Sequence, residues 1–198
     1  MNLIARGLST LSLALAATAF TAPAHAFTAE WVAEGNDFPA TIGGQGVLEY
    51  RNAGYDGAST FDWTVLPGSG GYSGNGSGEL WLLSPPNTAT THFTVESTAV
   101  AFVMNGDFND GFARFLVDDQ FVGEFDMFQR GPSSLVVRGL DLGLHSLAVV
   151  QVGEKISDSS DIHVAILGGA ALATVPLPAP LWLLGAGAVA LLRRRVGS

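Results

Sequence analysis

Two apolar segments that contain no acidic residue flank the part of this chain that can fold as a water-soluble domain. All 18 acidic residues lie between Glu30 and Asp161, whereas Arg6 stands near one end and an arginine cluster, 193–195, near the other. The stretch between the apolar segments has only 5 basic residues, which gives it a formal charge of −13. This division predicts one domain of about 150 residues, which is long enough for its own hydrophobic core.

The acidic balance and the lack of cysteine exclude several classes of protein. Nucleic-acid phosphates need Lys and Arg partners, so we expect no nucleic-acid partner, and we expect no direct docking on anionic lipid. With 0 cysteines, the chain has no disulfides, no thiolate zinc site and no cysteine nucleophile. Apolar burial alone must therefore stabilise the domain.

Residues 1–26 have the three parts of a secretory signal peptide. Arg6 supplies the positive charge, residues 8–20 form an Ala- and Leu-rich apolar run, and Ala24 and Ala26 form a small-x-small cleavage site. A buried helix or a membrane anchor is the alternative, but the run is short for a membrane span. We therefore expect the Sec export machinery and signal peptidase to act on the chain, and the mature protein to begin at Phe27.

Residues 175–198 carry a second apolar segment with a different layout. Three alternating prolines, in the run Val175-Pro176-Leu177-Pro178-Ala179-Pro180, force an extended piece of chain. The apolar run 181–192 would form a helix of about 18 Å, which is short of a hydrocarbon core of about 30 Å. Arg193, Arg194 and Arg195 would hold its far end in the cytoplasm by the positive-inside rule. The segment predicts a membrane helix with the domain outside, either as a sorting signal that is later removed or, as the alternative, an ordinary single-pass anchor.

The same segment resembles the PEP-CTERM sorting signals of Gram-negative bacteria, in their VPLPA variant. The resemblance is carried by Val175, Pro176, Leu177, Pro178 and Ala179, followed by an apolar helix and terminal arginines, and it covers about 24 residues. It implies processing near the proline motif by an exosortase, a membrane protease-transpeptidase. It also implies transit through the inner membrane and a final location at the cell surface or in an extracellular polysaccharide matrix.

The middle of the chain, 27–172, shows strand patterns and no convincing helix. Residues 99–104 form a continuous apolar run, as in a strand buried on both faces. Residues 111–125 alternate around Asp118 and Asp119 and predict a hairpin. Further strands are expected at 42–51, 60–66, 92–96, 135–138, 144–152 and 162–167, with a turn at 139–143. Short strands at this spacing predict an all-β sandwich, and the Gly- and Ser-rich stretch 67–78 is expected to be a surface loop within it.

Residues 112–172 also resemble the C-terminal half of galactose-binding-like jelly-roll domains. The resemblance rests on 113–119, a strand ending in a hairpin turn, and on 139–147, a "Gly-Leu-x-x-Gly-x-His-x-Leu" turn that includes His145. Asp119 stands where glycine is usual, and Leu144 where threonine is usual. The resemblance implies a jelly-roll sandwich, an architecture that hosts binding modules, adhesion domains and enzyme appendages.

Two sets of side chains are candidates for binding. Asp107, Asn109 and Asp110 place oxygen atoms at the short spacing that calcium accepts, although the same residues are typical of a solvated β-turn. Tyr55 and Tyr72 are the aromatic residues most suited to stacking on sugar rings. The other aromatic residues of the first half, Trp31, Trp63 and Trp81 among them, can equally pack in the core.

No catalytic constellation is recognisable in the sequence. His92, His145 and His163 form no metal pair, no serine lies in a nucleophile elbow, and any pair chosen among 18 acids would be arbitrary. We therefore expect a non-catalytic exported domain that binds carbohydrate, such as exopolysaccharide. A secreted polysaccharide hydrolase and a passive matrix component without a ligand are the alternatives.

Overall fold

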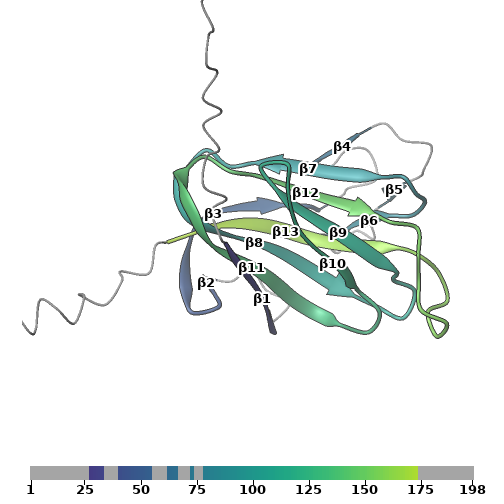
Figure 1. Ribbon diagram of the computed structural model, residues 1–198. Helices are drawn as coiled ribbons and strands as arrows, with labels where there is room; N and C mark the ends of the chain where they lie inside the picture. Colours follow the sequence, from purple (N-terminus) through teal and green to yellow (C-terminus); the bar gives the residue numbers. More distant parts are fainter. Residues whose placement is uncertain (1–26, 34–39, 55–61, 67–71, 74–77, 174–198) are drawn as a thin grey trace, which may run out of the picture.

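The computed structural model describes residues 27–33, 40–54, 62–66, 72–73 and 78–173. All regular structure in these residues is β-strand, and it forms two antiparallel sheets that lie as two layers (Figure 1). No helix in this part of the chain could cross a membrane. The described residues therefore form a β-sandwich, as the strand patterns predicted.

The first sheet contains eight strands, and its central strands are the longest. Its order is β1-β11-β8-β13-β3-β2, with β6 pairing to β13 and β5 to β6. The bounds are β1 Thr28–Ala33, β2 Thr41–Ile42, β3 Gln45–Asn52, β5 Tyr72–Ser73, β6 Leu80–Leu82, β8 Ser97–Gly106, β11 Gly131–Gly143 and β13 Val164–Leu172.

The second sheet has five strands in the order β10-β9-β12-β7-β4. The bounds are β4 Thr64–Leu66, β7 Thr88–His92, β9 Phe112–Val117, β10 Gln120–Asp126 and β12 Ser146–Gln151. The predicted hairpin is confirmed in β9 and β10. Asp118 and Asp119 form its two-residue turn with φ of 50° and 63°, as a tight hairpin of the type I′ kind requires.

Two predicted boundaries are wrong. The alternating stretch 92–96 is no strand, because β7 ends at His92, and the backbone N–H groups of Thr94 and Val95 bond the Glu49 carboxylate instead of a neighbouring strand. Residues 139–143 are no simple turn, because β11 continues to Gly143. Its ladder with β8 shifts there: Arg138 faces Ala99 and Gly143 faces Ser97, so that 139–142 bulge out of the sheet.

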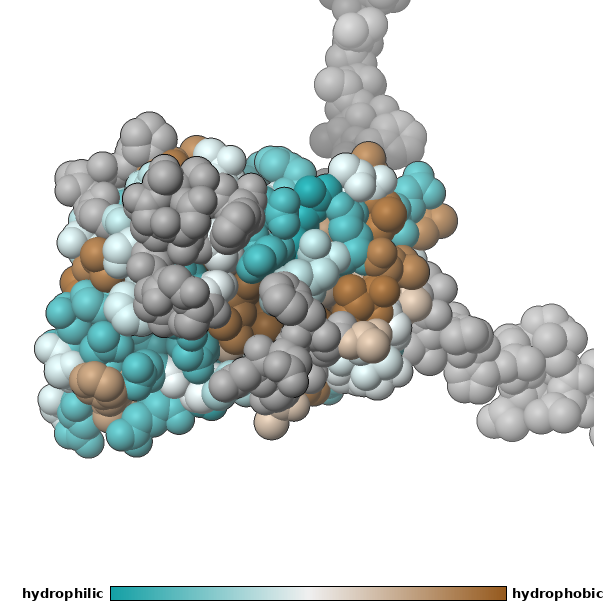
Figure 2. Space-filling view, turned by 180° about the vertical axis from the view of Figure 1, so that it is seen from behind, coloured by the Kyte–Doolittle hydropathy of each residue, from teal (hydrophilic) through white to brown (hydrophobic). Residues whose placement is uncertain are grey.

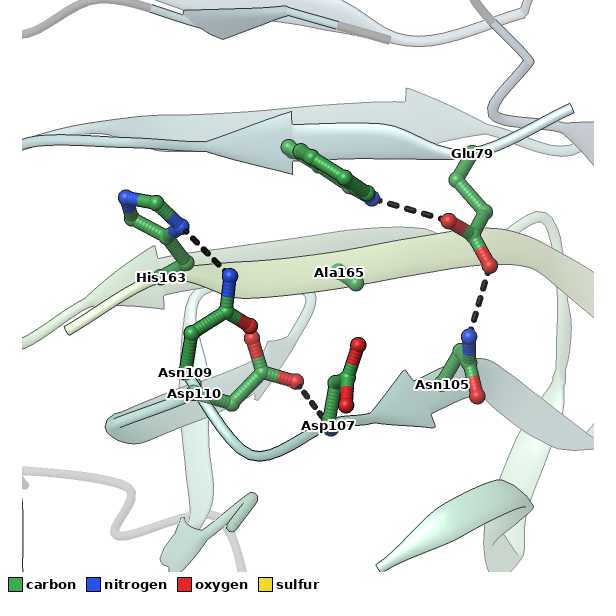
Figure 3. A pocket seen from close by; sticks show the side chains of 8 residues that line it. Glu79, Asn105, Asp107, Asn109, Asp110, His163 and Ala165 are labelled. Carbon is green, nitrogen blue, oxygen red and sulfur yellow. Dashed lines mark hydrogen bonds between the residues drawn. The ribbon is translucent and has the colours of Figure 1, made fainter. Parts of the chain in front are cut away.

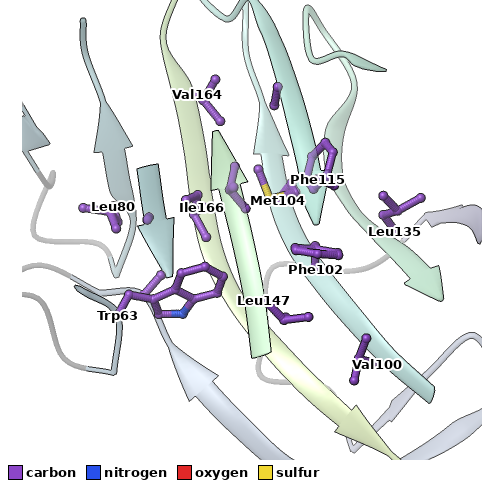
Figure 4. Packing of buried hydrophobic residues seen from close by; sticks show 14 of the residues in the cluster. Trp63, Leu80, Val100, Phe102, Met104, Phe115, Leu135, Leu147, Val164 and Ile166 are labelled. Carbon is purple, nitrogen blue, oxygen red and sulfur yellow. The ribbon is translucent and has the colours of Figure 1, made fainter. Parts of the chain in front are cut away.

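The main core lies between the two sheets. Phe102 from β8 meets Phe115 from β9 edge-to-face, with ring centroids 5.0 Å apart, and Leu135, Leu147 and Ile166 pack around them (Figure 4). Such aromatic pairs contribute about 0.5–1.5 kcal/mol beyond the burial of their area.

The central strand β8 is buried on both faces, as its apolar run predicted. Val100, Phe102 and Met104 face the core between the sheets, whereas Ala99, Ala101 and Val103 join a second cluster on the outer face of the first sheet. That cluster includes Ile42 of β2 and Leu172 of β13.

Both ends of the sandwich's chain lie at the same end of the first sheet. Thr28 of β1 faces Arg138 of β11, Arg138 faces Ala99 of β8, and Ala99 faces Leu172 of β13. These residues form one row across four strands, so β1 begins and β13 finishes at the same end of the sheet, with β11 and β8 between them. We call this end, with the 139–146 connection and the 118–119 turn, the tail end. The opposite end, where β8 finishes and β13 begins, is the loop end.

Candidate functional site

A small polar hollow at the loop end gathers side chains from three separate segments. Glu79 precedes β6, Asn105 is the last residue but one of β8, and His163 precedes β13. The loop after β8 is tied to the last segment by its backbone, because Gly111 N–H donates to His163 O at 2.8 Å and His163 N–H donates to Asn109 O at 3.0 Å. The lining residues are Glu79, Trp81, Asn105, Asp107, Asn109, Asp110, His163 and Ala165 (Figure 3).

Hydrogen bonds hold one wall of the hollow in place. The Glu79 carboxylate accepts from the indole Nε1 of Trp81 at 2.9 Å and from Nδ2 of Asn105 at 2.6 Å, so both of its oxygens are engaged. On the other side, Nδ2 of Asn109 lies 3.2 Å from Nδ1 of His163 (Figure 3). The wall residues are therefore fixed before any ligand arrives.

Asp110 is the most unusual group in the hollow. It is 1% exposed, and its Oδ2 accepts from the Asp107 backbone N–H at 2.6 Å. Burial raises the pKa of its carboxyl to about 7; that hydrogen bond opposes the rise, and the nearby carboxylates of Asp107 and Glu79 add to it. Near neutral pH, Asp110 therefore exchanges between its charged and neutral forms, and a perturbed carboxyl in a hollow is a frequent mark of a functional site.

The size of the hollow limits what it can hold. Its free volume is ≈ 10 Å³, which is about the space of one water molecule. It can therefore take a water, a small cation or one hydroxyl group of a larger ligand, and the body of such a ligand would have to lie on the rim.

The loop that lines the hollow also carries an exposed aromatic residue that the sequence patterns did not single out. Phe108 is 58% exposed and lies between Asp107 and Asn109, both of which line the hollow. Its backbone carbonyl accepts from the N–H of Ser160 at 3.1 Å, and Oγ of Ser159 donates to Asp110 O at 2.8 Å. The loop at 153–161 is thus hydrogen-bonded to the backbone of the Phe108 loop. The sequence did offer a signal, an aromatic residue between two polar ones. The Asn, Asp and Gly residues around it are typical of a turn, so the stretch was interpreted as a turn and Phe108 was not singled out.

The residues expected to bind calcium do lie together, on this loop. The loop itself uses several of their oxygens, because Asp107 Oδ1 accepts from Phe108 N–H at 2.6 Å and Asp110 Oδ2 accepts from Asp107 N–H. Among the described residues, no group of three His, Asp or Glu side chains is placed to hold a metal. Calcium at Asp107, Asn109 and Asp110 stays a prediction.

The expected aromatic residues take different places. Tyr55 lies outside the described residues. Tyr72 is 42% exposed and faces Leu82 across the β5–β6 ladder, whereas Trp81 faces Ser73, so Tyr72 and Trp81 belong to opposite faces of that ladder. Trp31 and Trp63 pack in the core, and Trp31 meets Phe115 and Phe125 edge-to-face. Of these residues, Trp81 alone lines the hollow.

A second hollow, of ≈ 90 Å³, lies at the tail end. It is lined by Phe27, Val117, Asp118, Gln120, Leu140, Asp141 and His145. The hydrogen bonds of His145 to Asp118, Ser97 and Asp141 there join three connections of the sandwich. The expected signal-cleavage residues Ala24 and Ala26 and the sorting residues, from Val175 to Ala179 and from Arg193 to Arg195, lie outside the described residues.

Two solved structures align with the chain at low sequence identity. No family model matches the chain, and no curated protein does. A family two carbohydrate esterase from Cellvibrio japonicus aligns at 12% identity with a TM-score of 0.45, over 78% of this chain and 36% of its own. A xanthan lyase from Paenibacillus aligns at 13% identity with a TM-score of 0.40, over 65% of this chain and 13% of its own. The chain thus spans about a third of the esterase and about an eighth of the lyase.

Proposed function

We propose that this chain is an exported, non-catalytic surface or matrix protein that binds carbohydrate at the loop end of a jelly-roll sandwich. The observation that carries the binding proposal is the position of Phe108, an exposed aromatic residue that stands in the chain between two residues lining the polar hollow. Sugar recognition needs this combination, because the apolar face of a pyranose stacks on an aromatic ring while its hydroxyls bond to carboxylates and amides.

The geometry suggests how one sugar unit would be held. Its ring would lie on Phe108, and one hydroxyl would enter the hollow and replace the water for which there is room. Asp107 and Asn109, the neighbours of Phe108 in the chain, would bond the adjacent hydroxyls. This proposal keeps carbohydrate as the ligand but moves the stacking residue to Phe108 from Tyr55 and Tyr72, which the sequence hypothesis named.

Binding is tested with the purified exported chain on a glycan array and in pull-down of extracellular polysaccharide. We expect Phe108→Ala to weaken retention at least tenfold. Phe121→Ala is the matched control, because Phe121 is equally exposed at 58% but belongs to β10 near the tail end. Equal retention by the two variants would move the site away from Phe108, and loss in Tyr55→Ala or Tyr72→Ala would restore the sequence hypothesis.

Export and sorting are supported by the two apolar segments of the sequence and by the place where the sandwich ends. Because β1 begins and β13 finishes in one row, neither flanking segment needs to cross the sandwich. We expect the exported chain to begin at Phe27. Removal of 175–198 should release it into the periplasm, whereas loss of exosortase should leave it in the inner membrane. Surface display of a chain that lacks residues 175–198, or display in a host that lacks exosortase, would refute the sorting proposal.

The alternative function is a polysaccharide hydrolase with Asp110 as its acid. Its pKa of about 7 suits a general acid. A partner carboxylate as nucleophile or base would also be needed. Turnover of a polysaccharide panel by the exported chain, abolished by Asp110→Asn, would establish this alternative; we expect none.

A further inference from the structure

Two exposed leucines lie at the tail end, beside the point where the chain leaves the sandwich. Leu142 is 65% exposed and Leu144 61%, the largest values among the exposed large hydrophobic residues of the described chain. Leu142 belongs to the bulge at 139–142, which the shifted β11–β8 ladder pushes beyond the sheet. In Figure 2, hydrophobic residues gather toward the right-hand end, which corresponds to the left-hand end of Figure 1, where β11 and β13 finish.

The chain length beyond the sandwich restricts how far this end can lie from a membrane. Ala173 is tied to the sheet, since its N–H donates to Gly46 O at 2.8 Å and its carbonyl accepts from Nε2 of Gln45. The apolar run begins at Leu181. Seven residues, 174–180, can span at most about 25 Å, so an inserted run keeps the tail end within that distance of the lipid.

We propose that the membrane-anchored chain stands on end, with Leu142 and Leu144 resting in the interface of a zwitterionic lipid surface and the Phe108 loop pointing away from it. This rests on the proposed anchoring by residues 181–192. The run of β8 from Ala99 to Asn105 separates the two ends by about 20 Å. The carbohydrate site therefore stays accessible while the chain waits for processing.

The charged residues at the tail end indicate which kind of lipid surface it can approach. Asp118, Asp119, Asp141 and Glu96 are exposed there, and the segments 93–98, 117–121 and 139–146 contain no Lys or Arg. Arg138, the basic residue of the row that defines the tail end, is paired with Glu30. Anionic headgroups would be repelled by these carboxylates. Leucine side chains, by contrast, enter an uncharged interface through apolar burial alone.

The lack of cysteine allows a direct test by site-specific labelling. Single-cysteine variants Leu142→Cys, Leu144→Cys and Phe108→Cys would be made in the exported chain, in a host without exosortase so that residues 174–198 are retained. Each would carry an environment-sensitive fluorophore and be reconstituted in phosphatidylcholine vesicles that contain a quencher in the lipid acyl chains. Flotation with the vesicles is measured first, because failure to float refutes the anchor and not the orientation.

For chains that float, we expect quenching at positions 142 and 144 to be at least twice that at position 108. Replacing part of the phosphatidylcholine by phosphatidylglycerol should reduce this difference. Equal quenching at all three positions, or most at position 108, would overturn the orientation. Energy transfer between labels at position 142 on different chains, without lipid quenching, would also overturn it, by showing that a second copy covers the leucines.

Discussion

The Nδ1 atom of His145 lies 2.6 Å from Oδ2 of Asp118, and the two residues join three connections at the tail end of the sandwich. The other ring nitrogen, Nε2, faces the backbone carbonyls of Ser97 and Asp141 at 3.0 and 3.1 Å. Oδ1 of Asp118 also accepts from the backbone N–H of Ser146 at 2.8 Å. Both ring nitrogens of the buried His145 therefore face acceptor atoms, and the ring links the 118–119 turn, the start of β8 and the 139–146 connection.

We expect His145→Ala to destabilise the domain by about 2–4 kcal/mol, because it leaves several acceptors without donors and removes a buried ring. Urea unfolding at pH 6.5 measures the loss. His92→Ala is the control, because His92 is exposed at the end of β7. A loss no larger than that of the control would show that the network contributes nothing to stability.

The partner carboxylate makes the tail end sensitive to acid. Burial alone would raise the pKa of Asp118, but hydrogen bonds from His145 and Ser146 outweigh it and hold this pKa below its ordinary value. A lowered pKa gives stability that is present above the ordinary pKa of Asp, about 4, and is lost as the pH falls through the lowered value. Asp118→Asn should therefore unfold with a smaller dependence on pH between about 5 and 2 than the natural chain, as followed by circular dichroism.

At the loop end, Asp110 should produce the opposite dependence on pH. Its pKa is raised to about 7, so the folded state binds more protons than the unfolded state between about pH 4 and pH 7. Stability from this group is therefore full below about pH 4 and is lost as the pH rises toward 7. Asp110→Asn keeps an oxygen for the Asp107 N–H and carries no charge, so we expect it to raise Tm by several degrees at pH 8 and by little at pH 4.5.

The same variant tests the calcium prediction. A cation bound by Asp107, Asn109 and Asp110 would relieve the repulsion between the carboxylates and stabilise the folded state by mass action. Under that hypothesis, 1 mM calcium should raise Tm of the natural chain at pH 8 and leave Asp110→Asn unchanged. An equal response of both chains would locate calcium elsewhere or nowhere.

Local patterns predicted the elements that depend on neighbours in sequence. The alternation around Asp118 and Asp119 located a hairpin, and the apolar run at 99–104 located a strand buried on both faces. The 139–142 bulge was missed because Gly139 and Gly143 are typical of a turn. That β11 continues to Gly143 depends on its pairing with β8. Short strands such as β5 were missed because two residues give no periodicity.

The candidate site was predictable only in part, for the same reason. Asp107, Asn109 and Asp110 are adjacent in sequence, and their oxygens were recognisable. Glu79 and Trp81 reach them only because β6 pairs with β13, where Trp81 faces Ala165. The register between strands more than 80 residues apart depends on the packing of the whole sandwich. It cannot be predicted from the spacing of residues within either strand.

The hairpin turn offers a stabilising substitution. Asp119 has a φ of 63°, a left-handed conformation that costs a non-glycine residue energy and that glycine adopts freely. We expect Asp119→Gly to stabilise the domain by about 0.5–1 kcal/mol, measured by urea unfolding. Asp118→Gly should instead destabilise it, because the Asp118 carboxylate bonds His145 and Ser146. Destabilisation by Asp119→Gly would mean that the Asp119 side chain has a structural role.

Two glycines at opposite ends of the sandwich should respond very differently to an added methyl group. A Cβ on Gly106, where β8 finishes beside the hollow, would lie 2.1 Å from the backbone carbonyl oxygen of Met127 and 2.7 Å from Cβ of Arg130. Neither of these atoms can swing away without moving the backbone, so we expect Gly106→Ala to destabilise the domain by about 2–4 kcal/mol and to disturb the Phe108 loop.

A Cβ on Gly143 would meet nothing within 4 Å, and Gly143→Ala is the matched control with a change expected within about 0.5 kcal/mol. Urea unfolding of both variants, with glycan retention measured on the same samples, separates the two effects. Equal stability of the two variants would contradict the close packing of β8 against the turn at 127–130.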